Sequence, residues 1–300
     1  MKVRVAAAQY PISQHSSFEA WASHVHQWVE DAAQNEAKLL VFPEYGAMEL
    51  TSIFPPNLQS SLQGQVFEFS NWQEKFIDVW KTAAQLHKVV IVAPSLPIIV
   101  DGRPVNRAMV FSEKGYVGYQ DKFFMTRFEN EEWGISSGEK VLSIFEADWG
   151  RFGIQICYDV EFPIGSQLLA SEGVQLVVAP SCTETIRGAT RVHIGARARA
   201  LENQLYTAVA QTVGNALWSP AVDINYGYAG FYATPDKNLP EEGIILLGEV
   251  QKPSWVYHTL DFDLLEQVRA DGQVFNYRDQ QSIATKLLYH KVETKIVKVG

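Results

Sequence analysis

Short apolar runs alternate with longer amphipathic segments along most of the 300-residue chain. The runs have the length and β-branched content of strands, whereas the segments repeat their apolar residues at helical spacing. In the segment 17–34, for example, Phe18, Trp21, Val25 and Trp28 repeat in this way, so we expect them to pack into the core. The alternation predicts an α/β fold with a mixed pair of sheets and helices outside them.

The positions of individual elements follow from the same pattern. Strands are expected at residues 3–8, 39–42, 89–93, 107–112, 116–120, 152–157, 176–179, 206–211, 244–249 and 255–260. Helices are expected at residues 17–34, 65–86, 163–171 and 189–204. No linker, low-complexity tract or internal repeat interrupts this order, so the sequence predicts a single domain over residues 1–300.

Charge and hydropathy exclude several classes of partner. The chain carries a net charge of −9 and has no basic cluster longer than residues 197–199. Nucleic acids and anionic membranes are therefore not expected as partners, because both bind through clustered positive charge. The longest apolar stretch, residues 89–100, contains Pro94 and Pro97 and is too short to span a bilayer.

Cysteine content and the N-terminal sequence indicate the cellular compartment in which the protein is expected. Two cysteines in 300 residues argue against a disulfide framework and for a reducing compartment. The N-terminal MKVRVAAAQYPI reads as a strand and not as a signal peptide, so a cytoplasmic enzyme is expected. There is no CxxC or HExxH spacing and no glycine-rich phosphate loop after a strand, so neither a metal nor a cofactor is predicted.

Cys157 lies at the end of the apolar run 152–156 and just before a turn and a helix that Pro163 helps to open. A thiol that a strand fixes at such a turn is well placed as a nucleophile, because the coming helix N-terminus favours the thiolate. The plainer alternative is that Cys157 is one more buried apolar residue, as isolated cysteines often are.

Two charged residues also follow expected strands. Glu44 comes after the run 39–42 and Pro43, which ends a strand ladder, so Glu44 is expected in a loop at a carboxyl end of the sheet. Lys122 follows the run 116–120 and precedes an aromatic and acidic loop. Each alone reads more simply as a solvated surface charge. With Cys157 they form a pattern.

That pattern, Glu44 in FPE, Lys122 in DK and Cys157 in CYD, resembles the catalytic set of the nitrilase superfamily, the carbon–nitrogen hydrolases. The resemblance extends to VRVAAAQ in the first strand, to VVAPSCTE after the cysteine and to GARARALENQLY with Asn203. It runs from Val3 to the strand around 255–260. The segment from about residue 262 onward carries no matching motif and is expected to be a C-terminal extension.

The resemblance implies a four-layer αββα sandwich and at least a homodimer formed through an outer helical face. It also implies the role of each residue. Glu44 is expected to be the general base, Lys122 to hold the oxyanion, and the backbone N–H of Tyr158 to be the second oxyanion donor. Cys157 would carry the acyl group as a thioester.

Members of the superfamily often have a second glutamate in the loop after the lysine, before a Pro-Gly pair. Ser137-Gly138 stands at that place here, and counting back six from Ser137 gives Glu131, with Glu132 as the alternative. The loop 128–133, which contains Trp133, and the stretch 218–232 are expected to shape the pocket. Cys182 is expected at a strand end, either as a packing residue or as a substrate contact.

The chain also departs from the pattern of the superfamily. Ile164 and Gln167 replace a glutamate and an arginine that usually follow the nucleophile. If these form a supporting ion pair, losing both leaves no unpaired buried charge, so we interpret the change as a variation that leaves the enzyme active.

A Cys–His pairing of the papain type is the main chemical rival. His15, His24 and His26 lie in or near the first expected helix, His87 ends another, and His193 lies in a helical stretch. Each reads more simply as a surface or capping residue.

The substrate is inferred from the residues after the nucleophile. Tyr158-Asp159 is commoner in amidases and carbamoyl-hydrolysing members, whereas nitrile-cleaving members tend to carry Trp-Glu. The resemblance therefore favours hydrolysis of a small linear amide or N-carbamoyl compound with release of ammonia or an amine. A nitrilase and a non-catalytic oligomeric scaffold are the alternatives. Acyl transfer to an amine is a third, although its membrane-bound form in this superfamily requires transmembrane helices.

Overall fold

The computed structural model describes residues 1–289, 295 and 297, and the remaining residues, all within the expected C-terminal extension, lie outside the described part. The strands are β1 (Lys2–Pro11), β2 (Leu39–Val41), β3 (Val90–Val92), β4 (Leu96–Val100), β5 (Arg103–Ser112), β6 (Gly115–Asp121), β7 (Ile144–Ala147), β8 (Gly150–Ile154), β9 (Leu176–Ser181), β10 (Tyr206–Asn215), β11 (Ile224–Asn225), β12 (Gly230–Tyr232), β13 (Ile244–Leu247) and β14 (Ser254–Asp261). The α-helices are α1 (Phe18–Gln34), α2 (Pro56–Gln59), α3 (Leu62–His87), α4 (Pro163–Ser171), α5 (Ile186–Asn203), α6 (Phe262–Asp271) and α7 (Asn276–Tyr289). Short helical turns of other types are η1 (Gly46–Ile53), η2 (Phe128–Trp133) and η3 (Cys157–Glu161).

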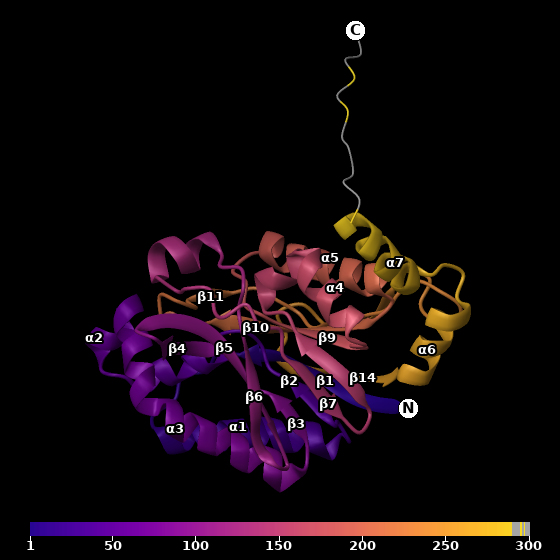
Figure 1. Cartoon of the computed structure of the whole chain (residues 1–300). Coiled ribbons are helices and arrows are strands. Elements are labelled where there is room, and N and C mark those ends of the chain that lie inside the picture. The colour runs from indigo at the N-terminus through magenta and orange to yellow at the C-terminus, as the bar shows by residue number, and fades with distance from the viewer. Residues whose placement is uncertain (290–294, 296, 298–300) are drawn as a thin grey trace.

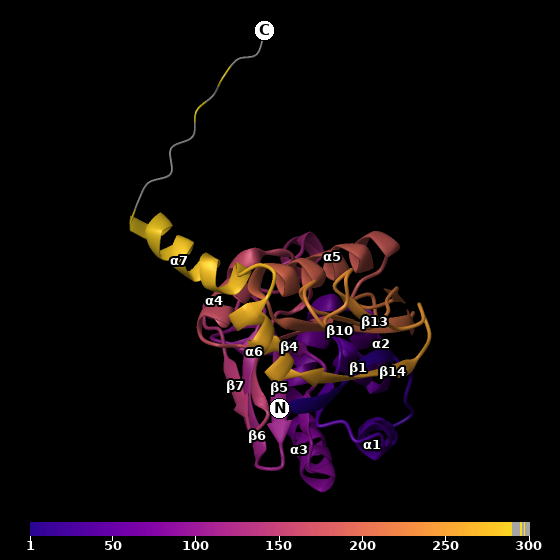
Figure 2. The same ribbon diagram turned by 90° about the vertical axis from the view of Figure 1, so that its right-hand side faces the viewer.

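The molecule has four layers. Helices α1 and α3 cover one side of the strands and α4 and α5 cover the other, with two layers of strands between them (Figure 1). Seen from the side, β1 and β14 lie in one strand layer and β10 and β13 in the other (Figure 2). This is the αββα sandwich that the sequence predicts.

Strand β1 joins the two strand layers. It pairs in parallel with β2 and antiparallel with β14 along most of its length, whereas its last residues pair in parallel with β10. The main path of hydrogen-bonded strands is β4-β5-β3-β2-β1-β10-β9-β8-β7. The mixture of parallel and antiparallel pairs confirms the predicted mixed sheets.

The side chains of β1 alternate between two cores, as the two-residue period of a strand requires. Val3, Val5 and Ala7 join the cluster that also contains buried residues of β8, β9 and β10. Ala8 and Tyr10 join the cluster formed with α1 and α3. Both faces of β1 are therefore buried, which explains its nearly continuous apolar sequence.

Helix α1 matches its prediction closely. Ser17 caps it, because the Ser17 side chain accepts a hydrogen bond from the backbone N–H of Ala20. Trp21 and Val25 are fully buried, and Phe18 and Trp28 pack against the same cluster. The aromatic stripe is thus part of the core, as predicted.

The other predicted elements are present with shifted ends, and several elements were not predicted. The strand expected at 152–157 ends at Ile154, and Cys157 instead begins the 3₁₀ turn η3. Strand β4 was missed because Pro97 lies within it, but β4 is the edge strand of the path, where proline is tolerated. Other missed elements are β7, β11, β12, α2, α6 and α7.

Across the described residues, none of the helices combines the length and the apolar character needed to cross a membrane.

Candidate active site

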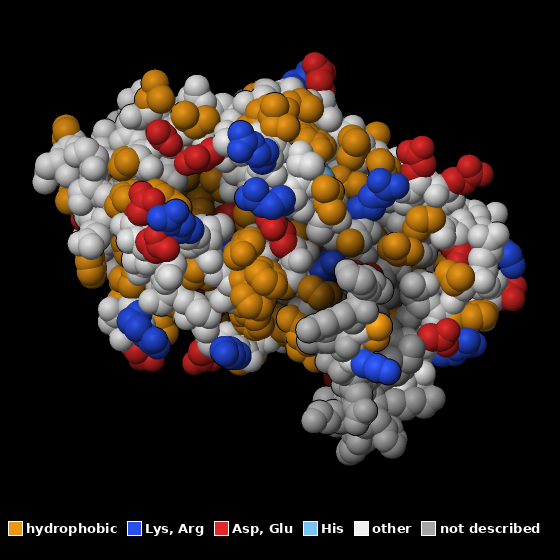
Figure 3. Space-filling model, turned by 90° about the horizontal axis from the view of Figure 1, so that it is seen from above, with side chains coloured by type: hydrophobic (Ala, Val, Ile, Leu, Met, Phe, Trp, Pro, Cys, Tyr) orange, Lys and Arg blue, Asp and Glu red, His pale blue; other side chains and the backbone are white. Residues whose placement is uncertain are grey.

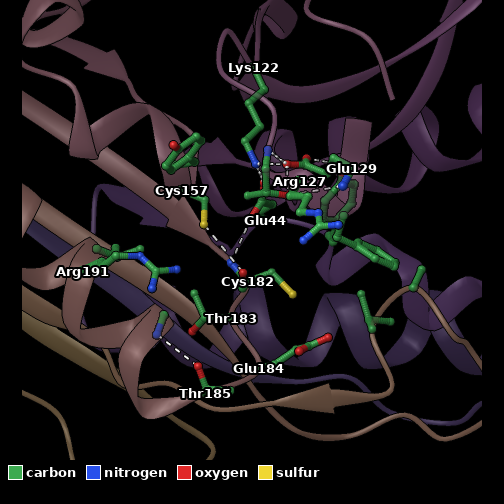
Figure 4. Close-up of a pocket in the computed structure, with 18 of the residues that line it drawn as sticks. Glu44, Lys122, Arg127, Glu129, Cys157, Cys182, Thr183, Glu184, Thr185 and Arg191 are labelled. Carbon is green, nitrogen blue, oxygen red and sulfur yellow. Dashed lines mark hydrogen bonds and ion pairs between the residues drawn. The ribbon is translucent and has the colours of Figure 1, made fainter. Parts of the chain in front are cut away.

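Glu44, Lys122 and Cys157 meet at one cavity of about 510 Å³, although they come from different strands (Figure 4). Glu44 follows β2 and the Phe42-Pro43 pair, Lys122 follows β6 directly, and Cys157 begins η3 just after β8. All three are buried, with 4% exposure or less. The sequence placed these three residues after strands, and the fold brings them together.

Lys122 lies between two carboxylates. Its ammonium donates to Glu44 Oε1 at 2.7 Å and to Glu129 Oε2 at 2.6 Å. Asn106, on the neighbouring strand β5, donates to the same Glu44 oxygen at 2.9 Å. A lysine ammonium has three N–H groups, so one remains to face a ligand in the cavity.

The second glutamate of the cluster is Glu129 and not Glu131. Glu129 is 1% exposed and accepts from Lys122, from Thr126 and from the Tyr45 hydroxyl, which donates at 2.7 Å. Glu131 is exposed and pairs with Arg127 at 2.7 Å. The count from Ser137 fails because residues 128–133 form a π-helical turn, whose wider winding changes which residues face inward.

Glu132 is also exposed and does not line the cavity. Trp133 is buried, lines the cavity and packs against Tyr45 with ring centroids 4.6 Å apart. Its indole N–H donates to the carbonyl of Leu62 at 3.1 Å, so Trp133 contributes a fixed apolar wall.

The charges in this cluster shift one another's pKa values. Burial acts to lower the pKa of Lys122, but the carboxylates of Glu129 and Glu44 outweigh it and hold the pKa well above its usual value. Burial raises the pKa of Glu44, and Lys122 offsets only part of that rise. For Glu129 the effect of burial is overcome by Lys122 and by hydrogen bonds, which lower its pKa. Of the two carboxylates, Glu44 is therefore the one that more readily takes up a proton.

Cys157 has a left-handed backbone, with φ of 48°. Such a conformation is uncommon for a residue with a side chain and recurs at functional positions. Burial and the nearby Glu44 carboxylate raise the pKa of the thiol well above its ordinary value, and Lys122 opposes them only in part. The raised pKa favours the protonated thiol at rest, whereas the helix N-terminus was expected to favour the thiolate.

Cys182 contributes its peptide groups to the site. Its backbone N–H donates to Glu44 Oε2 at 3.0 Å, and its carbonyl accepts from the Cys157 thiol at 3.6 Å. The Cys182 thiol lies close to Asn225 Oδ1, at 3.3 Å, and burial raises its pKa to about 12. The side chain lines the cavity, but its thiol contacts Asn225, whereas the Cys157 thiol is hydrogen-bonded to Glu44.

Asp159 ties the Lys122 loop to the Cys157 turn. Its carboxylate accepts from the backbone N–H groups of Phe123, Phe124 and Ile156 at 2.8 to 3.2 Å. Burial raises its pKa to about 7 even though these hydrogen bonds and Lys122 oppose the rise. Asp159 is therefore a positioning group, and sequence reasoning did not assign it this role.

The rest of the cavity wall comes from several loops and from the start of α5. Tyr158 lines it beside Cys157, and both stretches expected to shape the pocket contribute to its wall, as do Thr183, Glu184, Thr185 and other residues at the start of α5. Arg191 reaches the cavity from α5 and lies 3.4 Å from Glu161. The mouth thus carries charges of both signs.

The departures from the usual pattern lie outside the cavity. Ile164 is 49% exposed on α4, and neither it nor Gln167 lines the cavity wall. None of the histidines among the described residues lines the cavity either. His193, which was expected to be a surface or capping residue, is instead buried and stacks on Tyr228.

Comparison with known proteins decides the family. Residues 4–249 match the family described as carbon-nitrogen hydrolase. The chain belongs to the carbon-nitrogen hydrolase family. Among relatives, "Probable hydrolase YhcX" of Bacillus subtilis (strain 168) is 31% identical over 289 residues, which cover 96% of this chain and 56% of the relative. This carbon-nitrogen hydrolase thus spans little more than half the length of that relative.

Two further similarities lie within the same family. The chloroplastic omega-amidase of Arabidopsis thaliana is 24% identical over 284 residues, or 88% of this chain and 72% of the relative. An amidase from Nesterenkonia sp. AN1, of the nitrilase superfamily, has a TM-score of 0.70 at 17% identity, with 95% of each chain covered. That structure shows the acetamide moiety of fluoroacetamide added covalently at the active site cysteine of the Nesterenkonia enzyme. The likeness confirms the fold of this carbon-nitrogen hydrolase.

Proposed function

We propose that the protein hydrolyses the C–N bond of a small linear carboxamide or N-carbamoyl compound through a thioester on Cys157. The observation that carries this proposal is the meeting of Glu44, Lys122 and Cys157 at one buried end of an open cavity. An amide carbonyl is a poor electrophile, so hydrolysis needs an activated nucleophile, a stabilised oxyanion and a protonated leaving group. The cluster contains one group for each task.

In the first step, the Cys157 sulfur bonds to the carbonyl carbon and the thiol proton passes to Glu44. Glu44 lies within hydrogen-bonding reach of the thiol, and its raised pKa suits a proton acceptor. The carbonyl electron pair becomes an oxyanion. Lys122 has one N–H left for this oxyanion, and the backbone N–H of Tyr158 is the second donor.

In the second step, the oxyanion collapses and the C–N bond breaks. Glu44 returns its proton to the departing nitrogen, so ammonia or an amine leaves and an acyl thioester remains on Cys157. Water then attacks the thioester while Glu44 takes up one of the water protons. The acid product leaves, and the proton returns to the Cys157 thiol.

Relatives support an amide-type substrate. One is an omega-amidase, and another is an amidase whose active site cysteine bonds covalently to an acetamide group. The small cavity and its rigid Trp133 wall suit a short unbranched compound more than a peptide. Tyr158-Asp159 after the nucleophile favours an amide or carbamoyl compound over a nitrile by resemblance.

The test is a matched set of amide, ureido and nitrile compounds with the same carbon skeleton. We expect ammonia release and an acid product from the amide or ureido compound in preference to the nitrile. Product mass and ammonia should be measured together for each compound. A nitrile preferred by about tenfold or more in kcat/KM, or roughly 1.4 kcal/mol in transition-state stabilisation, would replace this proposal with a nitrilase.

A second prediction separates the two candidate glutamates. Glu129→Gln should lower kcat by roughly 10²-fold, because Lys122 loses one of the two carboxylates that fix its position. Glu131→Gln is the matched control and should leave kcat within about twofold, because its exposed pair with Arg127 contributes little. Steady-state kinetics of both variants measures this, and equal losses would refute the assignment of Glu129.

We further propose that the chain is a single hydrolase domain that forms a homodimer through the outer face of α4 and α5. Ile164, Leu168, Ile194 and Leu201 are exposed on these helices. Figure 3 views this side of the molecule and shows hydrophobic side chains among basic ones. Exposed apolar side chains that gather on one face favour association. Helices α6 and α7 lie beyond the family match and form the described part of the proposed extension.

A further inference from the structure

His15, His24 and Glu49 come together on the far side of β1 from the Cys157 core, and none of them lines the cavity. His15 lies between β1 and α1, His24 lies in α1, and Glu49 lies in η1. One potential ligand atom from each of the three lies within 4.8 Å of the other two. Among the described residues, no other three histidine, cysteine or acidic side chains meet this closely.

Glu49 is a buried carboxylate whose two oxygens have different surroundings. Oε1 accepts from the Tyr10 hydroxyl at 2.6 Å and from the Trp21 indole N–H at 2.7 Å. Oε2 lies 3.2 Å from His15 Nε2 and 3.4 Å from the backbone N–H of Ser13. Within the described part of the chain, no lysine or arginine pairs with Glu49. At 1% exposure the Glu49 carboxylate is almost completely removed from solvent, and a buried carboxylate is stabilised by a cationic partner.

His24 offers a nitrogen that the protein does not use. Its Nε2 is buried and has no hydrogen-bond partner. Its ring centroid lies 5.1 Å from that of His15, with the planes at 51°. A ring nitrogen without a hydrogen-bond partner can serve as a metal ligand through its lone pair when it is unprotonated.

We propose that His15, His24 and Glu49 form a binding site for a divalent transition-metal ion such as Zn²⁺. Two imidazole nitrogens and one carboxylate oxygen are a ligand set that Zn²⁺ takes in proteins. Ligand atoms about 2.0–2.1 Å from a tetrahedral ion lie roughly 3.3 Å apart, which is close to the His15–Glu49 distance of 3.2 Å. Binding would draw the His24 nitrogen, now within 4.8 Å of the other two ligand atoms, to the same spacing, and water would complete the fourth position.

The neighbours of Glu49 suit this role. Tyr10 and Trp21 hold Oε1, which orients the carboxylate and leaves Oε2 for the ion. A bound ion would give the buried carboxylate a fixed cationic partner and would give His24 Nε2 a partner. It would join α1 to η1, the turn that directly follows Glu44 and Tyr45. The site is thus structural and separate from the proposed hydrolysis, which uses no metal.

The test is calorimetric titration of Zn²⁺ into the full chain after treatment with a chelator. Cys157→Ala should be the background, because it removes the thiol of the active site as a competing ligand. We expect one Zn²⁺ per chain, and a visible absorption spectrum of tetrahedral type when Co²⁺ replaces it. His24→Gln and Glu49→Gln should each weaken binding by at least about 10²-fold.

His26→Gln is the matched control, because His26 lies on the same helix but outside the cluster. It should bind Zn²⁺ as tightly as the background protein. Circular dichroism of each variant separates loss of a ligand from loss of folding. The proposal is overturned if the background protein shows no saturable binding at micromolar Zn²⁺, if folded His24→Gln and Glu49→Gln bind undiminished, or if His26→Gln loses binding equally.

Discussion

Cys157→Ala should abolish turnover, lowering kcat by at least about 10⁴-fold, while the protein stays folded. The change removes the thiol that is hydrogen-bonded to Glu44, and it deletes a single sulfur from the start of η3. Without this thiol the proposed thioester cannot form, and water alone is a weak nucleophile toward an amide. Steady-state assays with the preferred amide and intact-mass analysis of the trapped intermediate measure the effect.

Cys182→Ala is the matched control, because it also removes a thiol from the cavity wall. It should retain most of the activity, since the Cys182 contacts with Glu44 and Cys157 come from its backbone. Substrate mass should add to the protein in this variant and not in Cys157→Ala. An adduct on Cys182, or normal turnover by Cys157→Ala, would show that the nucleophile is misassigned.

Lys122→Met should damage both the rate and the stability. The oxyanion loses one donor, so kcat should fall by at least about 10²-fold. Glu44 and Glu129 also lose the buried cation between them, and removing one partner of a buried ion pair costs about 3–5 kcal/mol of unfolding free energy. Kinetics and denaturant unfolding measure the two effects separately.

The double variant Lys122→Met with Glu129→Gln distinguishes these effects. Because it removes one of the two buried negative charges, it should recover part of the lost stability but none of the lost rate. Lys114→Met, at an exposed lysine, is the control and should change neither quantity. Recovery of activity in the double variant would mean that Lys122 serves only the charge balance of the cluster.

The sequence was sufficient to predict the layers of the fold and to place Glu44, Lys122 and Cys157 at the ends of strands. Apolar periodicity identifies strands such as β1 and helices such as α1, because burial dictates which residues repeat. The residues at the ends of these strands could then be selected by resemblance to a family. Their convergence could not be derived from spacing, because it depends on the pairing order of strands distant in the sequence.

Local backbone geometry and buried contacts could not be predicted in this way. Glu129 was missed because the π-helical turn changes which of residues 128–133 point into the cavity. The hydropathy pattern does not indicate such a turn. Asn106 was missed although it is a polar residue within an apolar strand, which is a usable signal of a buried contact. The pKa of the Cys157 thiol could not be predicted either, because the balance between burial, Glu44 and Lys122 is a property of the assembled site.

The peptide group at position 182 determines which substitutions this position can accept. Its N–H donates to Glu44, the proposed general base, and its carbonyl accepts from Cys157, the proposed nucleophile, so both contacts come from the main chain. The Cys182 side chain therefore affects the reaction only indirectly, because it sets the volume and polarity of its part of the cavity wall. Many small residues are acceptable at position 182, whereas proline is not, because it has no N–H to give to Glu44. Substitutions of the side chain at position 182 can thus change substrate preference while the backbone contacts with Glu44 and Cys157 are kept.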